Sequence, residues 1–223
     1  MHYGYGVFDG LRAYNAHQAP QIFKVKRHFE RLQKSAEKIN ISMPYSVQEM
    51  INYAYELLER NNMHEAYIRP LVFMDKNMTL KAIDADKPNV LMTCWKWNRY
   101  YPNNHLKILV SSWRRPHPRT MPVDTKVTGN YVNSILATRE AHQNGYDDAL
   151  LLDVEGYIAT GPGASFFMEK NGKLIVPPIT NIFPSITRAV LIDIAKQMGI
   201  DVIEKQFGVE EVIEAEGAFF TGT

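Results

Sequence analysis

The chain has 223 residues, of which 45% are hydrophobic, and its formal net charge at pH 7 is +1. This length suits one large domain or two modest ones, and the apolar content suffices for a core without covalent cross-links. The near-neutral charge, with no block of lysine or arginine, argues against a nucleic-acid-binding protein.

Several sequence features bear on location. Cys94 is the single cysteine, so the chain cannot form an internal disulfide. No apolar run approaches the roughly 20 residues that span a bilayer, and the opening residues lack the basic start and apolar stretch of a signal peptide. We therefore expect a soluble, cytoplasmic protein. The chain opens as a strand already under way, so we also expect a truncated N-terminus.

The chain is predicted to begin with a hairpin. Residues 3–14 and 21–25 have the composition of strands, and the NAHQAP segment between them that of a turn. Apolar residues then recur at helical spacing over 26–39, which predicts a helix. Ser46 and Glu49 have the spacing of a capping box and predict the start of a second helix, which runs to about Asn61.

Two domains are predicted around a linker. Strands at 66–74 and 89–97 complete a small α/β domain over residues 1–97, and the polar, turn-rich interval 98–104 has the character of a linker. The domain that follows, residues 105–223, is expected to have strands over 106–113, 147–154, 156–159, 165–170, 174–177, 201–206 and 217–222, with helices over 131–144 and 186–198. The predicted fold class is α/β, or α+β.

Two common kinds of active site find little support in the sequence. The seven histidines and the cysteine do not stand at metal-ligand spacing, so a zinc site is not expected. Ser165 follows Gly-Pro-Gly-Ala rather than occupying the centre of a G-x-S-x-G turn, which argues against a serine hydrolase.

Three features together suit pyridoxal phosphate, although each has an ordinary explanation as well. Lys126, in VDTKVTGNYVNS, offers an amine for the aldehyde, but most lysines are solvated surface groups. The stretch FPSITRAVL, residues 183–191, leads into a helix whose first N–H groups suit a phosphate, but an ordinary capped helix that binds no ligand would have the same sequence pattern. Arg31 adds a cation, although an arginine on a helix usually faces solvent.

Six motifs in order carry a resemblance to a known family: HYGYGVFDGLRAY, HFERL, YIRP, KVTGNYVNS, DVEGYIATGPG and FPSITR. They are similar to the successive motifs of class IV, pyridoxal-phosphate-dependent branched-chain amino acid aminotransferases, and the match spans essentially the whole chain. The resemblance implies a fold-type IV enzyme. Such an enzyme has a small N-terminal α/β domain and a larger C-terminal domain with a mixed sheet or pseudo-barrel.

The resemblance implies a cofactor site around Lys126. This lysine would form the internal aldimine with pyridoxal 5'-phosphate and move the proton between the substrate's α-carbon and the cofactor. Tyr131 would lie near the cofactor's 3' oxygen, and Arg31 would pair its phosphate. The other implied cofactor-binding residues are the backbone N–H groups of Ile186 and Thr187, Thr223 in the terminal turn, and Thr160.

The resemblance also implies the substrates and the assembly. Tyr67 and Arg69 of YIRP would hold a substrate carboxylate, and the apolar walls for a branched side chain would come from Tyr3, Phe8, Trp97 and Tyr100. The implied reaction is transamination of leucine, isoleucine or valine with 2-oxoglutarate. Because the family's opening strand lines the site of a partner subunit, a homodimer is implied too.

The sequence departs from the family pattern at several points. Thr160 stands where the family has a glutamate that pairs the pyridine nitrogen, which should lower the pKa of that nitrogen and weaken the electron sink. We expect Thr160 to hydrogen-bond a neutral nitrogen instead. Ala164 and Ser165 replace polar residues, and Asp9 replaces a glutamate. Family members also have segments before His2 and after Thr223, so a truncated chain is expected at both ends.

Two alternatives to a branched-chain aminotransferase follow from these departures. One is a class IV enzyme with altered chemistry or substrate, such as a lyase or a D-amino acid transaminase. The other is a non-catalytic relative that binds pyridoxal phosphate, or that has only a structural, dimer-forming role.

Overall fold

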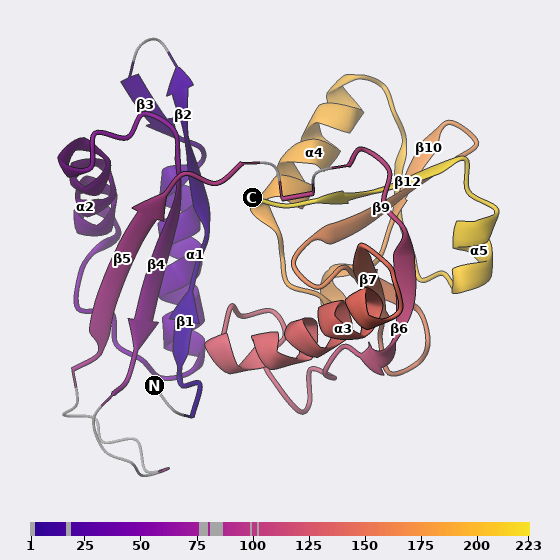
Figure 1. Cartoon of the computed structure of the whole chain (residues 1–223), viewed down its shortest axis with the longest axis horizontal. Helices are drawn as coiled ribbons and strands as arrows, with labels where there is room; N and C mark the ends of the chain where they lie inside the picture. The colour runs from indigo at the N-terminus through magenta and orange to yellow at the C-terminus, as the bar shows by residue number, and fades with distance from the viewer. Residues whose placement is uncertain (1–2, 17–18, 76–79, 81–86, 99, 102) are drawn as a thin grey trace. The chain divides into compact units, whose positions relative to one another are not determined.

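The computed structural model describes the chain apart from residues 1–2, 17–18, 76–79, 81–86, 99 and 102. The chain packs as two compact units, whose elements are labelled in Figure 1. The first unit comprises Met1–Pro102, Thr125–Gly129 and Thr223, and the second comprises Asn103–Asp124 and Asn130–Gly222. The division into domains at 1–97 and 105–223 remains a prediction. The linker predicted at 98–104 includes residues 99 and 102, which lie outside the described part.

An antiparallel sheet forms the base of the first unit. Strand β4 lies at its centre and pairs with β1, β2 and β5, while β3 pairs with β2. The strands are β1 (Gly6–Phe8), β2 (Leu11–Ala16), β3 (Ala19–Ile22), β4 (Ala66–Phe73) and β5 (Asn89–Trp95). The hairpin and the two later strands are thus confirmed.

Two details of the predicted hairpin are wrong. The first strand does not run unbroken through residues 3–14, because Asp9 and Gly10 separate β1 from β2. The second strand does not reach residue 25, because helix α1 (Val25–Lys38) begins there. Lys24 has φ 48°, a left-handed conformation that ends a strand and precedes this helix.

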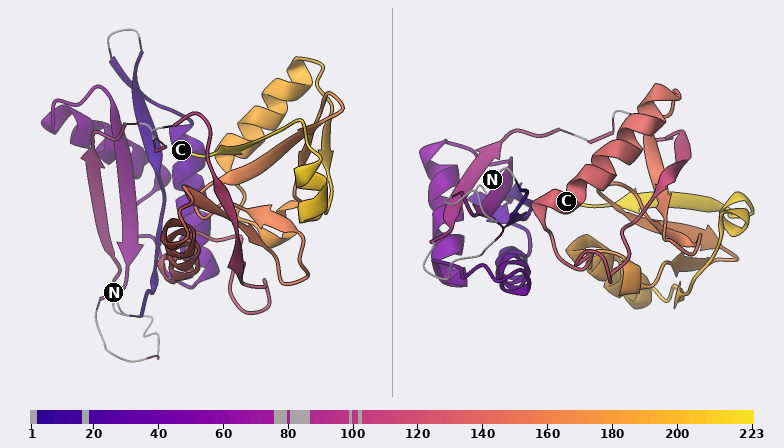
Figure 2. Two further views of the ribbon diagram at one scale, coloured as in Figure 1. Left: turned by 45° about the vertical axis from the view of Figure 1, so that its right-hand side comes forward. Right: turned by 90° about the horizontal axis from the view of Figure 1, so that it is seen from below.

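Helix α1 and helix α2 (Val47–Arg60) pack against one side of this sheet (Figures 1 and 2). The capping box at the start of α2 is present, since the Ser46 side chain accepts from Glu49 N–H and the Glu49 side chain accepts from Ser46 N–H. The buried core between sheet and helices comprises Val7, Leu11, Ala13, Ile22, Phe29, Leu32, Ala36, Ile41, Met50, Ala54, Leu58, Ala66, Ile68, Val72 and Val127.

Alternation along the strands turns other side chains to the opposite face of the sheet. Ile68 and Val7 belong to the core, so Tyr67, Arg69 and Phe8, which precede or follow them, face away from the helices. The strand period of two therefore places one aromatic and cationic face opposite the helical layer.

The second unit contains mixed sheets, as predicted. Strands β6 (Ile108–Arg114), β7 (Asp148–Leu152) and β8 (Ile158–Thr160) form a three-stranded sheet. Strands β9 (Ser165–Lys170), β10 (Lys173–Val176), β11 (Val202–Glu204) and β12 (Gly217–Thr221) form a four-stranded sheet in the order β11-β10-β9-β12. Both sheets combine parallel and antiparallel pairs, and their side chains share a core around Phe207.

The helices of the second unit are α3 (Tyr131–Gln143), α4 (Ile186–Gln197) and the short α5 (Val209–Ile213). The first two were predicted and α5 was not. Two single-turn helices, η1 (Thr128–Asn130, which begins in the first unit) and η2 (Ile179–Asn181), were not predicted either. None of the helices in the described part of the chain combines the length and the apolar character that a bilayer crossing requires.

Candidate active site

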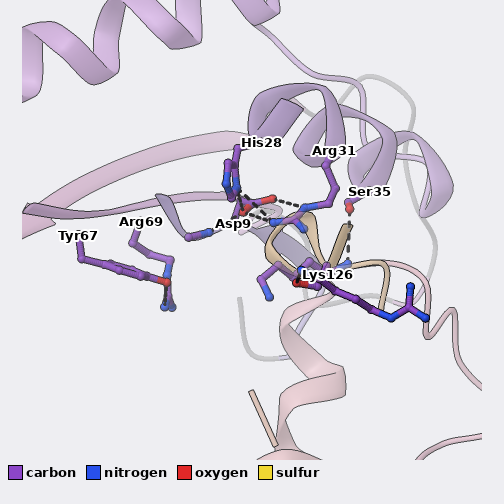
Figure 3. Close-up of polar contacts among 10 residues, drawn as sticks. Asp9, His28, Arg31, Ser35, Tyr67, Arg69 and Lys126 are labelled. Carbon is purple, nitrogen blue, oxygen red and sulfur yellow. Dashed lines mark hydrogen bonds and ion pairs between the residues drawn. The ribbon is translucent and has the colours of Figure 1, made fainter. Parts of the chain in front are cut away.

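Lys126 lies in a short segment that belongs to the first unit. Its carbonyl accepts from Phe8 N–H at 3.1 Å, and its own N–H donates to Ser35 Oγ at 3.4 Å. The next residue, Val127, makes a β-bridge with Val7, and its side chain joins the core. Strand β1 and helix α1 therefore fix the backbone of Lys126 from two directions (Figure 3).

The Phe8 ring lies beside two cationic groups. Lys126 Nζ is 5.0 Å from the centre of the ring, and Arg69 Cζ is 4.7 Å from it. Arg69 Cζ is also 5.1 Å from the centre of the Tyr67 ring, and Arg69 Nη2 donates to Tyr67 Oη at 2.8 Å. Among the described residues no ion pair of Arg69 occurs, so its guanidinium is available for the carboxylate of a ligand.

A buried carboxylate organises the other cation of this unit. Asp9 is fully buried, and its Oδ2 and Oδ1 accept from Arg31 Nε at 2.9 Å and Nη2 at 2.7 Å. His28 Nδ1 lies 2.9 Å from Asp9 Oδ1, and Gly10 N–H donates to the same oxygen at 2.7 Å. Figure 3 shows how these contacts join the bend after β1 to α1.

The ionisation of Asp9 depends on these partners. Burial opposes the charged form, but the positive charge of Arg31 and hydrogen bonds from His28 and Arg31 outweigh it. The pKa of Asp9 is therefore held well below its usual value. Arg31, whose side chain is 15% exposed, keeps a fixed orientation and contact with solvent.

Aromatic rings extend from Tyr67 along the same unit. The Tyr67 ring lies 4.6 Å from Trp97, and Trp97 lies 5.9 Å from Tyr100, between ring centres. Arg12 Nη1 donates to the carbonyl of Trp97 at 2.9 Å and fixes that backbone. Tyr3 is 56% exposed in the single chain.

In the second unit, the start of α4 presents backbone donors. Ser185 is the N-cap, and its side chain accepts from Arg188 N–H at 3.2 Å. Ile186 and Thr187 occupy the first helical positions, where N–H groups have no intrahelical acceptor. Arg188 is buried and donates to Glu204 and to the Pro177 carbonyl, so this arginine is part of the packing.

Two other predicted site residues also lie in the second unit. Thr160, at the end of β8, donates its hydroxyl hydrogen to the Ala164 carbonyl at 2.6 Å. This hydroxyl hydrogen is therefore engaged by the carbonyl, and the hydrogen bond from Thr160 to a neutral ring nitrogen stays a prediction. Tyr131 begins α3. Burial lowers the pKa of Arg115, and the interaction of Arg115 with Tyr131 acts in the opposite direction.

The structure therefore brings Lys126, Phe8, Tyr67 and Arg69 together in the first unit, with Arg31 on α1 of the same unit. Thr223 is exposed. Sequence reasoning missed the roles of Asp9 and of three further residues, which are Gly10, His28 and Ser35. The sequence could have indicated one of these contacts, that between His28 and Arg31, because the two residues are three positions apart and lie on the same face of a helix.

The donor set fits pyridoxal phosphate. In the first unit an amine stands on a fixed backbone and a guanidinium is held in place by a buried carboxylate. The second unit, described by itself, has a capped helix start that offers neutral N–H donors. These are the groups that an aldehyde and a phosphate dianion require.

Comparisons with known proteins agree with this chemistry. A family profile described as amino-transferase class IV matches residues 6–223. The branched-chain-amino-acid aminotransferase of Salmonella typhimurium is 36% identical over 229 residues, which cover all of this chain and 74% of the relative.

Solved structures give the same result. A crystal structure of Escherichia coli branched-chain amino acid aminotransferase matches 99% of this chain and 75% of its own, with a TM-score of 0.96 and 35% identity. The branched-chain amino acid aminotransferase from Thermobaculum terrenum, in its PLP-form, matches 97% and 73%, with a TM-score of 0.91 and 34% identity. The predicted fold type is confirmed, and the chain belongs to the class IV aminotransferase family.

Proposed function

We propose that this aminotransferase moves the amino group of leucine, isoleucine or valine to 2-oxoglutarate. The observation that carries the proposal is Lys126, whose backbone is held by Phe8 and Ser35 and whose amine lies 5.0 Å from the centre of the Phe8 ring. The chain is 36% identical over its whole length to a relative named for branched-chain amino acids. Pyridoxal 5'-phosphate is the cofactor, and when bound it withdraws electrons from the amino acid's α-carbon.

Lys126 carries the central chemistry in this proposal. Its amine would bind the cofactor's aldehyde in the resting enzyme. Once the amino group of the substrate has displaced it, the freed amine would take the proton from the α-carbon and later return one. The contacts of its backbone with Phe8 and Ser35 support this role, because a base works only from a fixed position.

Several residues would hold the cofactor without reacting. In the first unit we assign the phosphate to Arg31, and Thr223 to the same end of the cofactor. In the second unit Ile186 and Thr187 would donate backbone N–H groups, and Tyr131 would contact the 3' oxygen. Thr160 would face the ring nitrogen and donate its hydroxyl hydrogen there in place of the Ala164 carbonyl.

The substrate side would be the aromatic and cationic face of the first unit. Arg69 and Tyr67 would hold a carboxylate, supported by the hydrogen bond that fixes Arg69. An apolar side chain would contact the rings of Phe8, Trp97, Tyr100 and Tyr3. Because Tyr3 is exposed in the single chain, we propose that it serves the site of a second subunit in a homodimer.

The alternatives raised by Thr160 are not favoured. The relatives described above are named as aminotransferases, and the lysine that the reaction requires is in place. A lyase, a D-amino acid transaminase and a non-catalytic protein have no comparable support.

Absorption spectroscopy of the purified protein with pyridoxal phosphate tests the proposal. We expect a near-visible band that L-leucine or L-glutamate shifts to that of the aminated cofactor, and that 2-oxoglutarate then restores. A band that no amino acid changes would contradict transamination, and conversion by D-amino acids alone would contradict the substrate.

The variant Lys126→Ala tests whether Lys126 is the residue that binds the cofactor. After borohydride reduction of the protein with cofactor, mass spectrometry should find the pyridoxyl group on Lys126 of the wild type and nowhere in the variant. Turnover should fall by about a hundredfold to ten-thousandfold or more, the usual contribution of a positioned acid or base. A labelled variant would show that another lysine is the attachment point.

A further inference from the structure

Gly10 is glycine because of its neighbour rather than its backbone angles. A Cβ added at Gly10 would lie 1.9 Å from Tyr67 Oη and 2.7 Å from Tyr67 Cζ, and its φ is outside the left-handed range. Real atoms do not approach so closely, so the Tyr67 phenol occupies the place that any side chain at position 10 would take. Both residues are buried, and the phenol therefore has little room to move.

The position of the phenol in turn sets the position of Arg69. Arg69 Nη2 donates to Tyr67 Oη at 2.8 Å, and the guanidinium lies near the Tyr67 and Phe8 rings. Arg69 Nε is buried without a hydrogen-bond partner among the described residues. With no ion pair to anchor it there, the guanidinium depends on the Tyr67 hydroxyl and these rings for its orientation.

We propose that Gly10 is a positioning residue for carboxylate recognition: by leaving space for the Tyr67 phenol, it fixes the Arg69 guanidinium that receives the substrate's carboxylate. The inference rests on the proposed role of Arg69. It adds that this role of Arg69, in strand β4, requires a residue without a side chain 59 positions earlier, in the bend between β1 and β2.

The position of Gly10 also explains why the effect should be local. Its N–H donates to Asp9 Oδ1, and this backbone contact survives replacement of glycine by alanine. The Arg31 cluster should therefore keep its geometry in Gly10→Ala, while Tyr67 moves. Gly10→Ala is thus expected to weaken the binding of a carboxylate and to leave the binding of the cofactor unchanged.

The experiment compares glutarate with its neutral diamide, glutaramide, as ligands of the holoenzyme. Their dissociation constants are measured from the change in the cofactor's absorption. In Gly10→Ala we expect glutarate to bind about tenfold to a hundredfold more weakly, the loss of one hydrogen bond to a charged group, with glutaramide and pyridoxal phosphate unchanged. Gly217→Ala is the control, because a Cβ there meets only ordinary contacts at 3.5 Å or more.

Equal weakening of both ligands, or of neither, would overturn the proposal. If Gly10→Ala does not fold, Tyr67→Leu, which removes the phenol, is compared instead with the double variant that carries both changes. Adding Gly10→Ala to Tyr67→Leu should then change neither ligand's affinity, and a further loss of glutarate binding would overturn the proposal. Arg69→Ala distinguishes failure of the Gly10 proposal from failure of the proposed role of Arg69. Glutarate binding that survives this change would refute the role of Arg69 itself.

Discussion

The first unit and the start of α4 offer a negatively charged ligand two different kinds of partner. Arg31 brings a full charge, and the fully buried Asp9, with His28, fixes its orientation. Helix α4 brings neutral N–H groups, which need only the cap of Ser185. A charged group at a mostly buried position requires a long-range network, whereas a helix end requires only a few consecutive residues.

Asp9→Asn should break the first of these arrangements and give the largest effect. Removing one partner of a buried ion pair typically costs about 3–5 kcal/mol of stability. Urea unfolding followed by tryptophan fluorescence measures it. Asp193→Asn, at an exposed position on α4, is the control and should change little. A loss as small as that of the control would show that Asp9 does not hold the cluster.

The same variant should alter the dependence of stability on pH. The pKa of Asp9 is lowered in the folded state, so its stabilisation is present above the unfolded value of about 3.9 and is lost as pH falls below it. The unfolding free energy of the wild type should therefore decline more steeply than that of Asp9→Asn below about pH 4. Parallel pH profiles would contradict the ion pair.

Arg31→Ala should give an intermediate effect, on the cofactor rather than on turnover. Loss of a charge-assisted hydrogen bond of about 1.5–3 kcal/mol corresponds to roughly tenfold to a hundredfold weaker binding. Titration with pyridoxal phosphate gives the affinity, and kcat is measured at saturating cofactor. Arg27→Ala, an exposed arginine on the same helix, is the control.

If Arg31→Ala does not fold, Arg31→Lys retains the charge without the planar fork and still should weaken the cofactor. A fall in kcat with unchanged cofactor affinity would refute the assignment of Arg31 to the phosphate.

Ser185→Ala should give the smallest effect on stability and cofactor affinity, and it tests the difference between the Arg31 cluster and the start of α4. Loss of an N-cap side chain costs about 1 kcal/mol of stability. Cofactor affinity should fall less than in Arg31→Ala, because the backbone N–H groups remain. Ser46→Ala, at the capping box of α2, gives a similar loss of stability without any change in cofactor binding. A larger fall in affinity for Ser185→Ala than for Arg31→Ala would reverse the comparison.

What could be predicted from sequence follows the same division. The start of α2 was predicted because Ser46 and Glu49 are three residues apart, and α4 because FPSITR carries its own cap. The sheet strands were predicted from local composition, and the six ordered motifs identified the family. The short helix α5 was missed, since five residues carry too little periodicity to stand out.

The remainder depends on contacts between distant residues. From the sequence, Asp9 is only a replacement for a glutamate of the family, because nothing near it in the sequence reveals its contact with Arg31, 22 positions away. The break between β1 and β2 has the same origin, since Asp9 turns toward α1 and Gly10 leaves room for Tyr67. The hydrogen bond from Thr160 to the Ala164 carbonyl joins two sides of one turn, and the spacing of the motif alone does not reveal it.

The discontinuity of the first unit has a consequence for folding during synthesis. Thr128 Oγ1 donates to the carbonyl of Gly4 across 124 positions, and Val127 supplies part of the core of the first unit. A nascent chain that has emerged only to residue 102 therefore lacks one piece of this core. We expect the core of the first unit to be complete only after residues 125–129 leave the ribosome, so the lysine-bearing segment is the last part of this core to be added.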